Sequence, residues 1–244
     1  MILLMYLCSH NMKRYTPILV LSSFLMLTGV SCKWNPQDQP STGEPTHLSD
    51  TTGKSFGFEN EAEQYESPDR VIWQKPDLVI QQLGDVEGKV VADLGAGTGY
   101  FSRRIAYKGA KVIAIDIDPK AIQWMEEQKA RFPIELQDRL VIRLAEANDP
   151  KLNPNEVNIV LLVNTYSYIQ DRVPYFSRLK ECIRPGGHVL IIDFKKKETP
   201  FGPPIGERVD VKEVEKELIE SGYTVTNVDE ASLDYQYIIK AQRN

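Results

Sequence analysis

The chain contains few of the residues that bind metal ions, with three cysteines and three histidines among 244 residues. These residues nowhere approach the spacing of zinc ligands, so the sequence predicts no metal site. His10 and His47 lie outside the predicted domain and His188 falls in a predicted strand, which argues against a histidine as general base. Cys182 is expected to be a small packing residue on a helix rather than a nucleophile.

An excess of positive charge is also absent, because 29 lysines and arginines stand against 34 acidic residues, for a net charge of −5. Tight nucleic-acid binding depends on a basic field. The one local basic cluster, residues 195–197, is typical of a solvated loop. The sequence therefore predicts no nucleic-acid partner. The length suits one α/β domain with a short appendage.

The N-terminal region lacks an apolar run long enough to span a bilayer, which takes about 20 residues. Residues 17–30 are apolar, follow Lys13 and Arg14, and have the length of a signal-peptide core. Small residues then lead to Cys32, which resembles the lipobox of bacterial lipoproteins, where the cysteine is lipidated. We therefore expect residues 1–32 to be a signal peptide and lipobox, and translation to start at Met12.

This resemblance implies a membrane-anchored lipoprotein of the bacterial cell envelope, on the periplasmic side. A plain cleaved signal and an uncleaved anchor, which would leave the domain on the cytoplasmic face, are the alternatives. Residues 33–58 contain several prolines, serines and threonines and no apolar periodicity, so they are expected to form a flexible tether. The remaining residues, 59–244, form the predicted domain.

The stretch 90–101 is the centre of that domain. A buried strand carries Asp93 near its end, glycines follow at alternate positions, and a helix begins at once. Glycine permits positive φ and lets a ligand lie against the main chain, and the helix start directs free N–H groups at the same place. A dinucleotide fingerprint requires glycine at position 100, where Tyr100 stands. This argues against a nicotinamide-dependent oxidoreductase and leaves a chance glycine turn as the simpler alternative.

A second predicted strand, 111–116, ends in Asp116 about 20 positions beyond Gly97, where a carboxylate accepts hydrogen bonds from ribose hydroxyls. Asp118 competes for this role. It is better suited to cap the helix that begins at Pro119.

Strands and helices alternate along the rest of the chain, so the predicted sheet is mainly parallel and covered on both faces. Further strands are expected at 140–144, 157–163, 188–194, 223–229 and 233–241, and helices at 59–67, 76–84, 121–132, 171–183 and 211–221.

The glycine turn, the acidic second strand, Arg184-Pro-Gly-Gly before the fifth strand and the closing strand pair occur in an order that resembles class I S-adenosylmethionine-dependent methyltransferases. The likeness covers about residues 60–244 and extends loosely to the ubiquinone and menaquinone methyltransferases. It implies a Rossmann-like, doubly wound, mainly parallel seven-stranded sheet with an antiparallel last strand. S-adenosylmethionine is the implied cofactor.

The resemblance also implies roles for individual residues around this cofactor. Its amino-acid part is expected to lie against Asp93, Gly95, Ala96, Gly97 and Gly99. The ribose is expected at Asp116, the adenine against Ile117 with its edge at Glu146 and Ala147, and the opposite wall at Asn164.

Methyl transfer from a sulfonium needs alignment more than acid–base chemistry. Tyr166 and Asp193 are the candidate bases, with structural hydrogen bonding as the alternative for each, and Trp73 is either a lid or a packing residue. The expected acceptor is a small molecule or a lipid. A catalytically inactive cofactor- or partner-binding module on the same fold is the other interpretation, because export separates the domain from cytoplasmic cofactor.

Overall fold

A computed structural model describes residues 56–243. The predicted signal peptide, Met12, Cys32 and almost all of the predicted tether lie outside the described residues. The helices, in chain order, are α1 (Phe56–Tyr65), α2 (Arg70–Trp73), α3 (Pro76–Gln82), α4 (Tyr100–Tyr107), α5 (Pro119–Lys129), α6 (Ile134–Gln137), α7 (Arg172–Cys182) and α8 (Val211–Glu220), with short 3₁₀ helices η1 (Tyr166–Tyr168) and η2 (Ile205–Glu207).

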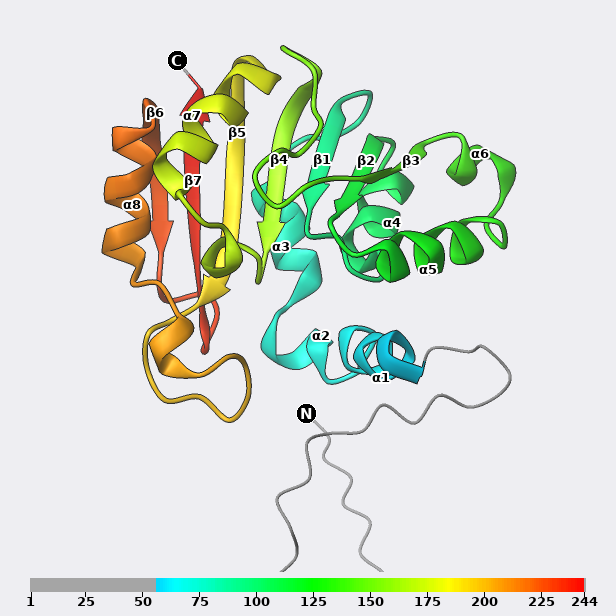
Figure 1. Ribbon diagram of the computed structural model, residues 1–244, viewed down its shortest axis with the longest axis horizontal. Helices are drawn as coiled ribbons and strands as arrows, with labels where there is room; N and C mark the ends of the chain where they lie inside the picture. Colours follow the sequence, from blue (N-terminus) through cyan, green and yellow to red (C-terminus); the bar gives the residue numbers. More distant parts are fainter. Residues whose placement is uncertain (1–55, 244) are drawn as a thin grey trace, which may run out of the picture. The chain divides into compact units, whose positions relative to one another are not determined.

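Seven strands form one sheet in the order β3-β2-β1-β4-β5-β7-β6 (Figure 1). They are β1 (Val90–Leu94), β2 (Lys111–Asp116), β3 (Leu140–Leu144), β4 (Val157–Val163), β5 (Ile183–Phe194), β6 (Tyr223–Asp229) and β7 (Gln236–Arg243). The first five pair in parallel, and β7 lies antiparallel between β5 and β6. The predicted fold class is confirmed.

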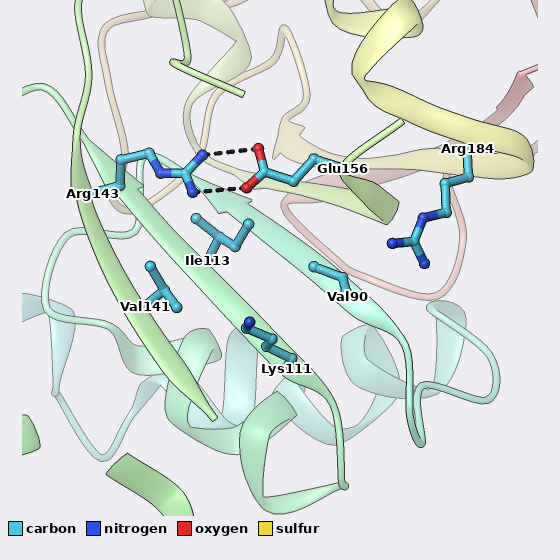
Figure 2. Close-up of a pocket in the computed structure, with 7 residues that line it drawn as sticks. All are labelled: Val90, Lys111, Ile113, Val141, Arg143, Glu156 and Arg184. Atoms are coloured by element: carbon cyan, nitrogen blue, oxygen red, sulfur yellow. Dashed lines mark hydrogen bonds and ion pairs between the residues drawn. The ribbon is translucent and has the colours of Figure 1, made fainter. Parts of the chain in front are cut away.

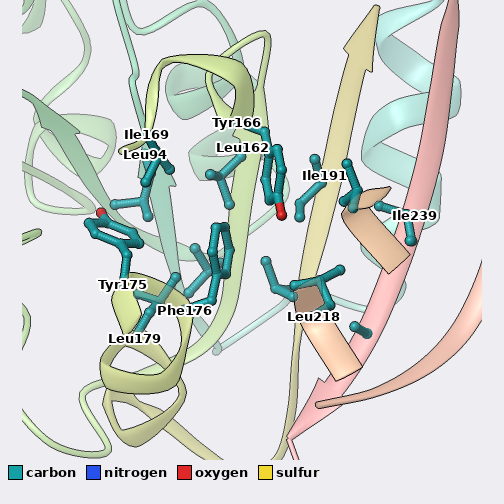
Figure 3. Packing of buried hydrophobic residues seen from close by; sticks show 14 of the residues in the cluster. Leu94, Leu162, Tyr166, Ile169, Tyr175, Phe176, Leu179, Ile191, Leu218 and Ile239 are labelled. Carbon is teal, nitrogen blue, oxygen red and sulfur yellow. The ribbon is translucent and has the colours of Figure 1, made fainter. Parts of the chain in front are cut away.

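Helices cover both faces of this sheet, as alternation of strand and helix requires. On one face, α3 and α4 pack on Val91, Val112 and Leu161. On the other, α7 and α8 contribute aromatic and aliphatic side chains to a core that includes Leu162 and Ile191 (Figure 3).

Two strand boundaries differ from the sequence prediction. Strand β5 begins at Ile183 rather than at residue 188, because Ile183 pairs with Val157 before a register shift. In that irregular stretch, a Cβ on Gly187 would lie 2.3 Å from the carbonyl oxygen of Asn158. Strand β7 begins at Gln236 because residues 230–235 form a bend, in which the amides of Ala231 and Ser232 donate to the carboxylate of Asp229.

The crossover from β3 to β4 contains no helix within the described chain, unlike the crossovers on either side of it. Next to it, a hollow of about 250 Å³ lies at the amino-terminal edge of β1–β3 (Figure 2). A bidentate ion pair borders this hollow. In it, Arg143 donates to both carboxylate oxygens of Glu156, at 3.0 and 2.8 Å. This is the edge opposite the predicted cofactor site.

Candidate functional site

The glycine turn after β1 folds back onto β2. The amides of Gly95 and Ala96 both donate to the carbonyl oxygen of Ile115, at 2.9 and 3.0 Å. Gly95, Gly97 and Gly99 have φ values of 72°, 56° and 77°. Residues with a Cβ are energetically disfavoured in this left-handed region. The alternate glycines therefore allow the tight turn.

The carboxylate of Asp116 lies directly against this turn. It accepts from the amide of Gly97 at 2.8 Å and from the amide of Asp118 at 3.0 Å. Asp118 in turn caps α5 by accepting from the amide of Lys120, which is the capping role predicted for it. The turn and the acidic end of the second strand are therefore brought together as the spacing predicted.

Asp93 is 3% exposed and accepts from the hydroxyl of Ser102 at 2.6 Å. Burial raises the pKa of Asp93 to about 6, against the opposing effects of the Ser102 hydrogen bond and the charge of Arg70. This carboxyl group therefore ties the end of β1 to α4. Its predicted place beside the cofactor's amino-acid part stays a prediction.

Two large apolar side chains are exposed where β2 and β3 end. Ile117 is 58% exposed and Leu144 is 50% exposed, and Leu144 pairs in register with Asp116. An exposed apolar pair beside a carboxylate suits a flat base attached to a sugar. The sequence prediction included Ile117 and missed Leu144, although Leu144 is the last apolar residue of its strand.

Glu146 and Ala147 are exposed just beyond β3. The Glu146 carboxylate pairs with the amine of Lys151 at 2.7 Å, and Lys151 also contacts Asp149 at 2.9 Å. Exposed pairs of this kind contribute only about 0–1 kcal/mol, so they do not fix Glu146 in place. Its predicted contact with the adenine edge stays a prediction.

The same crossover borders a hollow of about 530 Å³ against α7, which is lined partly by Cys182. The thiol of Cys182 lies 3.4 Å from the carbonyl oxygen of Leu152, and burial raises its pKa. A raised pKa disfavours the reactive thiolate, which supports the packing role predicted for Cys182.

Asn164, just after β4, is held in the left-handed region at φ 56°. Its side-chain oxygen accepts from the amide of Gln236 at 2.5 Å, and the Gln236 oxygen accepts from the amide of Gln74 at 3.2 Å. Gln74 also accepts from the buried guanidinium of Arg70. This polar chain joins α2 to the carboxyl edge of the sheet. Sequence reasoning missed it, because its members are far apart in the chain and no local pattern marks them.

The end of α1 covers the glycine turn. Glu66 accepts from the hydroxyl of Thr98 at 2.7 Å and from both terminal nitrogens of Arg103, at 2.8 and 2.5 Å. The ring of Tyr65 lies 3.5 Å from where a Cβ on Gly97 would be. These contacts were also missed by the sequence prediction.

Trp73 packs in an aromatic cluster. Its ring centroid is 4.7 Å from that of Phe201 and 6.0 Å from that of Phe194, and Phe201 is 5.1 Å from Tyr235. The cluster joins α2 to the loop after β5 and to the start of β7. These contacts support the packing role of Trp73, and a lid role stays a prediction.

The structure gives Tyr166 a role different from the predicted base. Tyr166 is fully buried, and its hydroxyl donates to Glu217 of α8 at 2.5 Å, where Arg172 also donates to Glu217. Burial and the Glu217 hydrogen bond raise the pKa of Tyr166 well above its ordinary value. Its ring packs among core side chains (Figure 3), so structural hydrogen bonding, the stated alternative, accounts for this residue.

Asp193, the other candidate base, lies at the carboxyl end of β5 and is 2% exposed. It accepts from the amides of Phe194 at 2.7 Å and Ser167 at 3.4 Å. Burial raises the pKa of Asp193 to about 6, so this carboxyl group is mostly ionised at neutral pH. As a base it stays a prediction.

Within residues 56–243, no group of three or more histidine, cysteine and acidic side chains is arranged to hold a metal ion. None of the helices in this range combines the length and apolar character that a membrane crossing requires.

Known proteins with similar sequences are methyltransferases. Residues 85–242 match the family described as methyltransferase domain. The chain is 27% identical over 116 residues to a ubiquinone biosynthesis O-methyltransferase of Alkalilimnicola ehrlichii, covering 47% of this chain and 45% of that protein. It is 28% identical over 149 residues to phosphoethanolamine N-methyltransferase 1 of Triticum aestivum, covering 59% of this chain and 28% of that protein.

Among solved structures, an S-adenosylmethionine-dependent methyltransferase from Aquifex aeolicus superposes with a TM-score of 0.70 and 25% identity, covering 76% of this chain and 98% of that one. The chain therefore belongs to the methyltransferase-domain family, in the S-adenosylmethionine-dependent class I group. The match spans less than half the length of the two curated relatives.

The residues present fit this family's cofactor. At Gly95 the absence of a Cβ is explained by the chain itself, because a Cβ there would lie 2.3 Å from Thr165 Oγ1. The fit rests on the strand ends beside the turn. The Asp116 carboxylate adjoins the turn, and Ile117 and Leu144 expose apolar surface beside it.

Proposed function

We propose that this chain transfers a methyl group from S-adenosylmethionine to a small-molecule or lipidic acceptor. The observation that carries the proposal is the Asp116 carboxylate lying 2.8 Å from the amide of Gly97. This contact places the main-chain turn next to the acidic end of the second strand. A ligand made of a nucleoside linked to an amino acid requires both features side by side.

The residues that would hold the cofactor come from the ends of four adjacent strands, β3, β2, β1 and β4. Ligands in open α/β sheets bind outside the carboxyl ends of the strands, which is where these residues lie. The amino-acid part would lie against Asp93 and the turn formed by Gly95, Ala96, Gly97 and Gly99, the ribose against Asp116, and the base between Ile117, Glu146 and Ala147, with Asn164 opposite.

When bound, the sulfonium supplies an already activated methyl group, so the protein's main tasks are orientation and exclusion of water. The aromatic cluster of Trp73, Phe194 and Phe201 would help to exclude water beside the end of β5. Asp193, ionised at neutral pH, is the candidate base. Relatives include both an O- and an N-methyltransferase by name, so family membership leaves the accepting atom open.

Calorimetry of the full chain with S-adenosylhomocysteine tests this proposal. We expect saturable binding at one site, with no comparable binding of NAD. Absence of binding would overturn the proposal.

A catalytically inactive binding module is the second candidate. It is favoured by the structural role of Tyr166, which leaves Asp193 as the remaining predicted base. Cofactor binding without methyl transfer to any member of a broad acceptor panel would decide for it.

The location of the protein is part of the proposal and is supported by the sequence of residues 13–32. Lipidation of Cys32 would anchor the domain to a membrane of the cell envelope, on the periplasmic side, or on the cytoplasmic face if the signal is an uncleaved anchor. Palmitate labelling of wild type and Cys32→Ala, with cell fractionation, tests it. Equal labelling of both proteins would contradict lipidation at Cys32.

A further inference from the structure

The carboxylate of Asp193 is buried without a cationic partner. No lysine or arginine of residues 56–243 forms an ion pair with it. Arg208 is near enough to act on it electrostatically, but its guanidinium donates to main-chain carbonyl oxygens of the loop after β5, including those of Pro203 and Lys197. Burying an unpaired carboxylate is costly, so the negative charge at this point calls for a functional explanation.

Two hydroxyl groups beside Asp193 are also left without partners. Ser167 donates its main-chain amide to Asp193, yet its side-chain oxygen is buried and makes no hydrogen bond. Tyr237 lies opposite Asp193 in the register of β5 and β7, and its hydroxyl is likewise buried and unpartnered. Buried polar groups are normally satisfied. Two such hydroxyls around one unpaired carboxylate therefore indicate a site that receives hydrogen-bonding groups from outside the chain.

Tyr168, which follows Ser167 in the chain, is 65% exposed. Partial burial and the negative charges of Asp193 and Glu207 raise the pKa of Tyr168. An exposed aromatic ring within the field of two carboxylates attracts a cation both through its π face and through simple charge.

The cluster adjoins the cofactor turn. Thr165, the N-cap residue of η1, fills the space over Gly95. Tyr168 ends the same short helix, and its amide donates to the carbonyl oxygen of Thr165 at 3.1 Å. A group bound at Tyr168 is therefore next to the turn that the cofactor would occupy.

We propose that the surface formed by Tyr168, Asp193 and Glu207 is the acceptor subsite and that it takes a cationic amine, so that the methylated atom is a nitrogen. This inference rests on the proposed function. An ammonium group brings the positive charge that the two carboxylates lack and N–H donors for the unpartnered hydroxyl oxygens. Before transfer the bound ammonium would give one proton to the Asp193 carboxylate, which frees the nitrogen lone pair. That lone pair would take the methyl carbon as its bond to the sulfonium sulfur breaks, and the sulfur would leave as the neutral thioether of S-adenosylhomocysteine. An alcohol of the same shape brings no charge and a single donor.

The test is calorimetry of the full chain, saturated with S-adenosylhomocysteine, against primary amines and the alcohols that share their carbon skeletons. 2-Phenylethylamine and 2-phenylethanol are the first pair. The amine should bind at least roughly tenfold more tightly than the alcohol. Glu207→Gln, Asp193→Asn and Tyr168→Leu should each weaken amine binding several-fold more than alcohol binding, so that the preference for the amine falls.

Glu198→Gln, which removes an exposed carboxylate from the same loop, is the matched control and should leave amine affinity unchanged. Glu207 and Tyr168 are exposed, so their variants report on the site even if Asp193→Asn does not fold. Equal affinity for amines and alcohols, binding of neither, or loss of both in every variant would overturn the inference. Binding of S-adenosylhomocysteine, measured first in the same samples, reports separately on the proposed function.

Discussion

The main-chain amide of Gly97 donates to the carboxylate of Asp116 at 2.8 Å, which links the first crossover of the sheet to the end of the second strand. The other oxygen of this carboxylate accepts from the amide of Asp118. Both oxygens therefore lie in fixed positions before any ligand arrives, and the carboxylate can accept further hydrogen bonds through its remaining lone pairs.

The first prediction concerns this carboxylate. Asp116→Ala should weaken binding of S-adenosylhomocysteine roughly 10- to 100-fold, because a hydrogen bond to a charged group contributes about 1.5–3 kcal/mol. Calorimetry measures the change. Asp118→Ala is the control, since it removes the cap of α5 at about 1 kcal/mol of stability while leaving the Asp116 carboxylate in place. Equal affinities of the two variants would contradict the ribose role of Asp116.

The second prediction concerns the space over Gly95. Gly95→Ala places a Cβ 2.3 Å from Thr165 Oγ1, so it should destabilise the fold by about 2–4 kcal/mol, the sum of a left-handed backbone penalty and overpacking. Gly84 has φ 79° and open space around it, so Gly84→Ala should show the backbone penalty alone. Denaturant unfolding measures both.

Adding Thr165→Ala to Gly95→Ala should restore part of the lost stability, because the steric conflict is with that side chain. A double variant no more stable than Gly95→Ala would show that Thr165 is not the obstacle.

Much of this arrangement follows from local pattern. The spacing of Gly97 and Asp116 and the cap at Asp118 were predictable, because each depends on residues near one another in sequence or at the ends of neighbouring parallel strands. The polar chain from Gln74 to Gln236 was not, since its side chains meet only after β7 enters the sheet beside β5. Tyr166 shows the same limit. Its position after β4 suggested a base, whereas its burial against α8 depends on packing that no motif records.

The third prediction concerns Glu66, which joins α1 to the glycine turn through Thr98 and Arg103. These hydrogen bonds lower the pKa of Glu66 against the opposing effect of burial. A carboxyl group whose pKa is lowered by folding stabilises the fold at pH values above its unfolded pKa, here 4.5. This contribution is lost as the pH falls through the pKa of the folded state. Glu66→Gln should therefore reduce the free energy of unfolding by about 1–2 kcal/mol at pH 7, and by much less at pH 3.

Glu63→Gln removes an exposed carboxylate from α1, close to Glu66 in the chain, and is the matched control. Hydrogen exchange of the amides of residues 62–74 should be faster in Glu66→Gln than in Glu63→Gln. Identical exchange in the two variants would show that the Glu66 contacts do not hold α1 against the turn.

The last prediction concerns His188, whose Nε2 is buried without a partner. Burial, together with the charges of Lys240 and Lys89, lowers the pKa of His188 to about 4. The unfolded chain therefore binds a proton at His188 near pH 6.5, while the folded chain does not until about pH 4, so this residue reduces stability as pH falls between those values. Asp93 and Asp193, whose pKa values are raised to about 6, act in the opposite direction.

His188→Gln leaves both carboxyl groups in place, so the difference in melting temperature between variant and wild type isolates the histidine. We expect that difference to shift in favour of the variant between pH 7 and pH 5, and to change little between pH 7 and pH 8, where His188 is mostly neutral in both states. A difference independent of pH over the whole range would show that His188 is not held neutral by the fold.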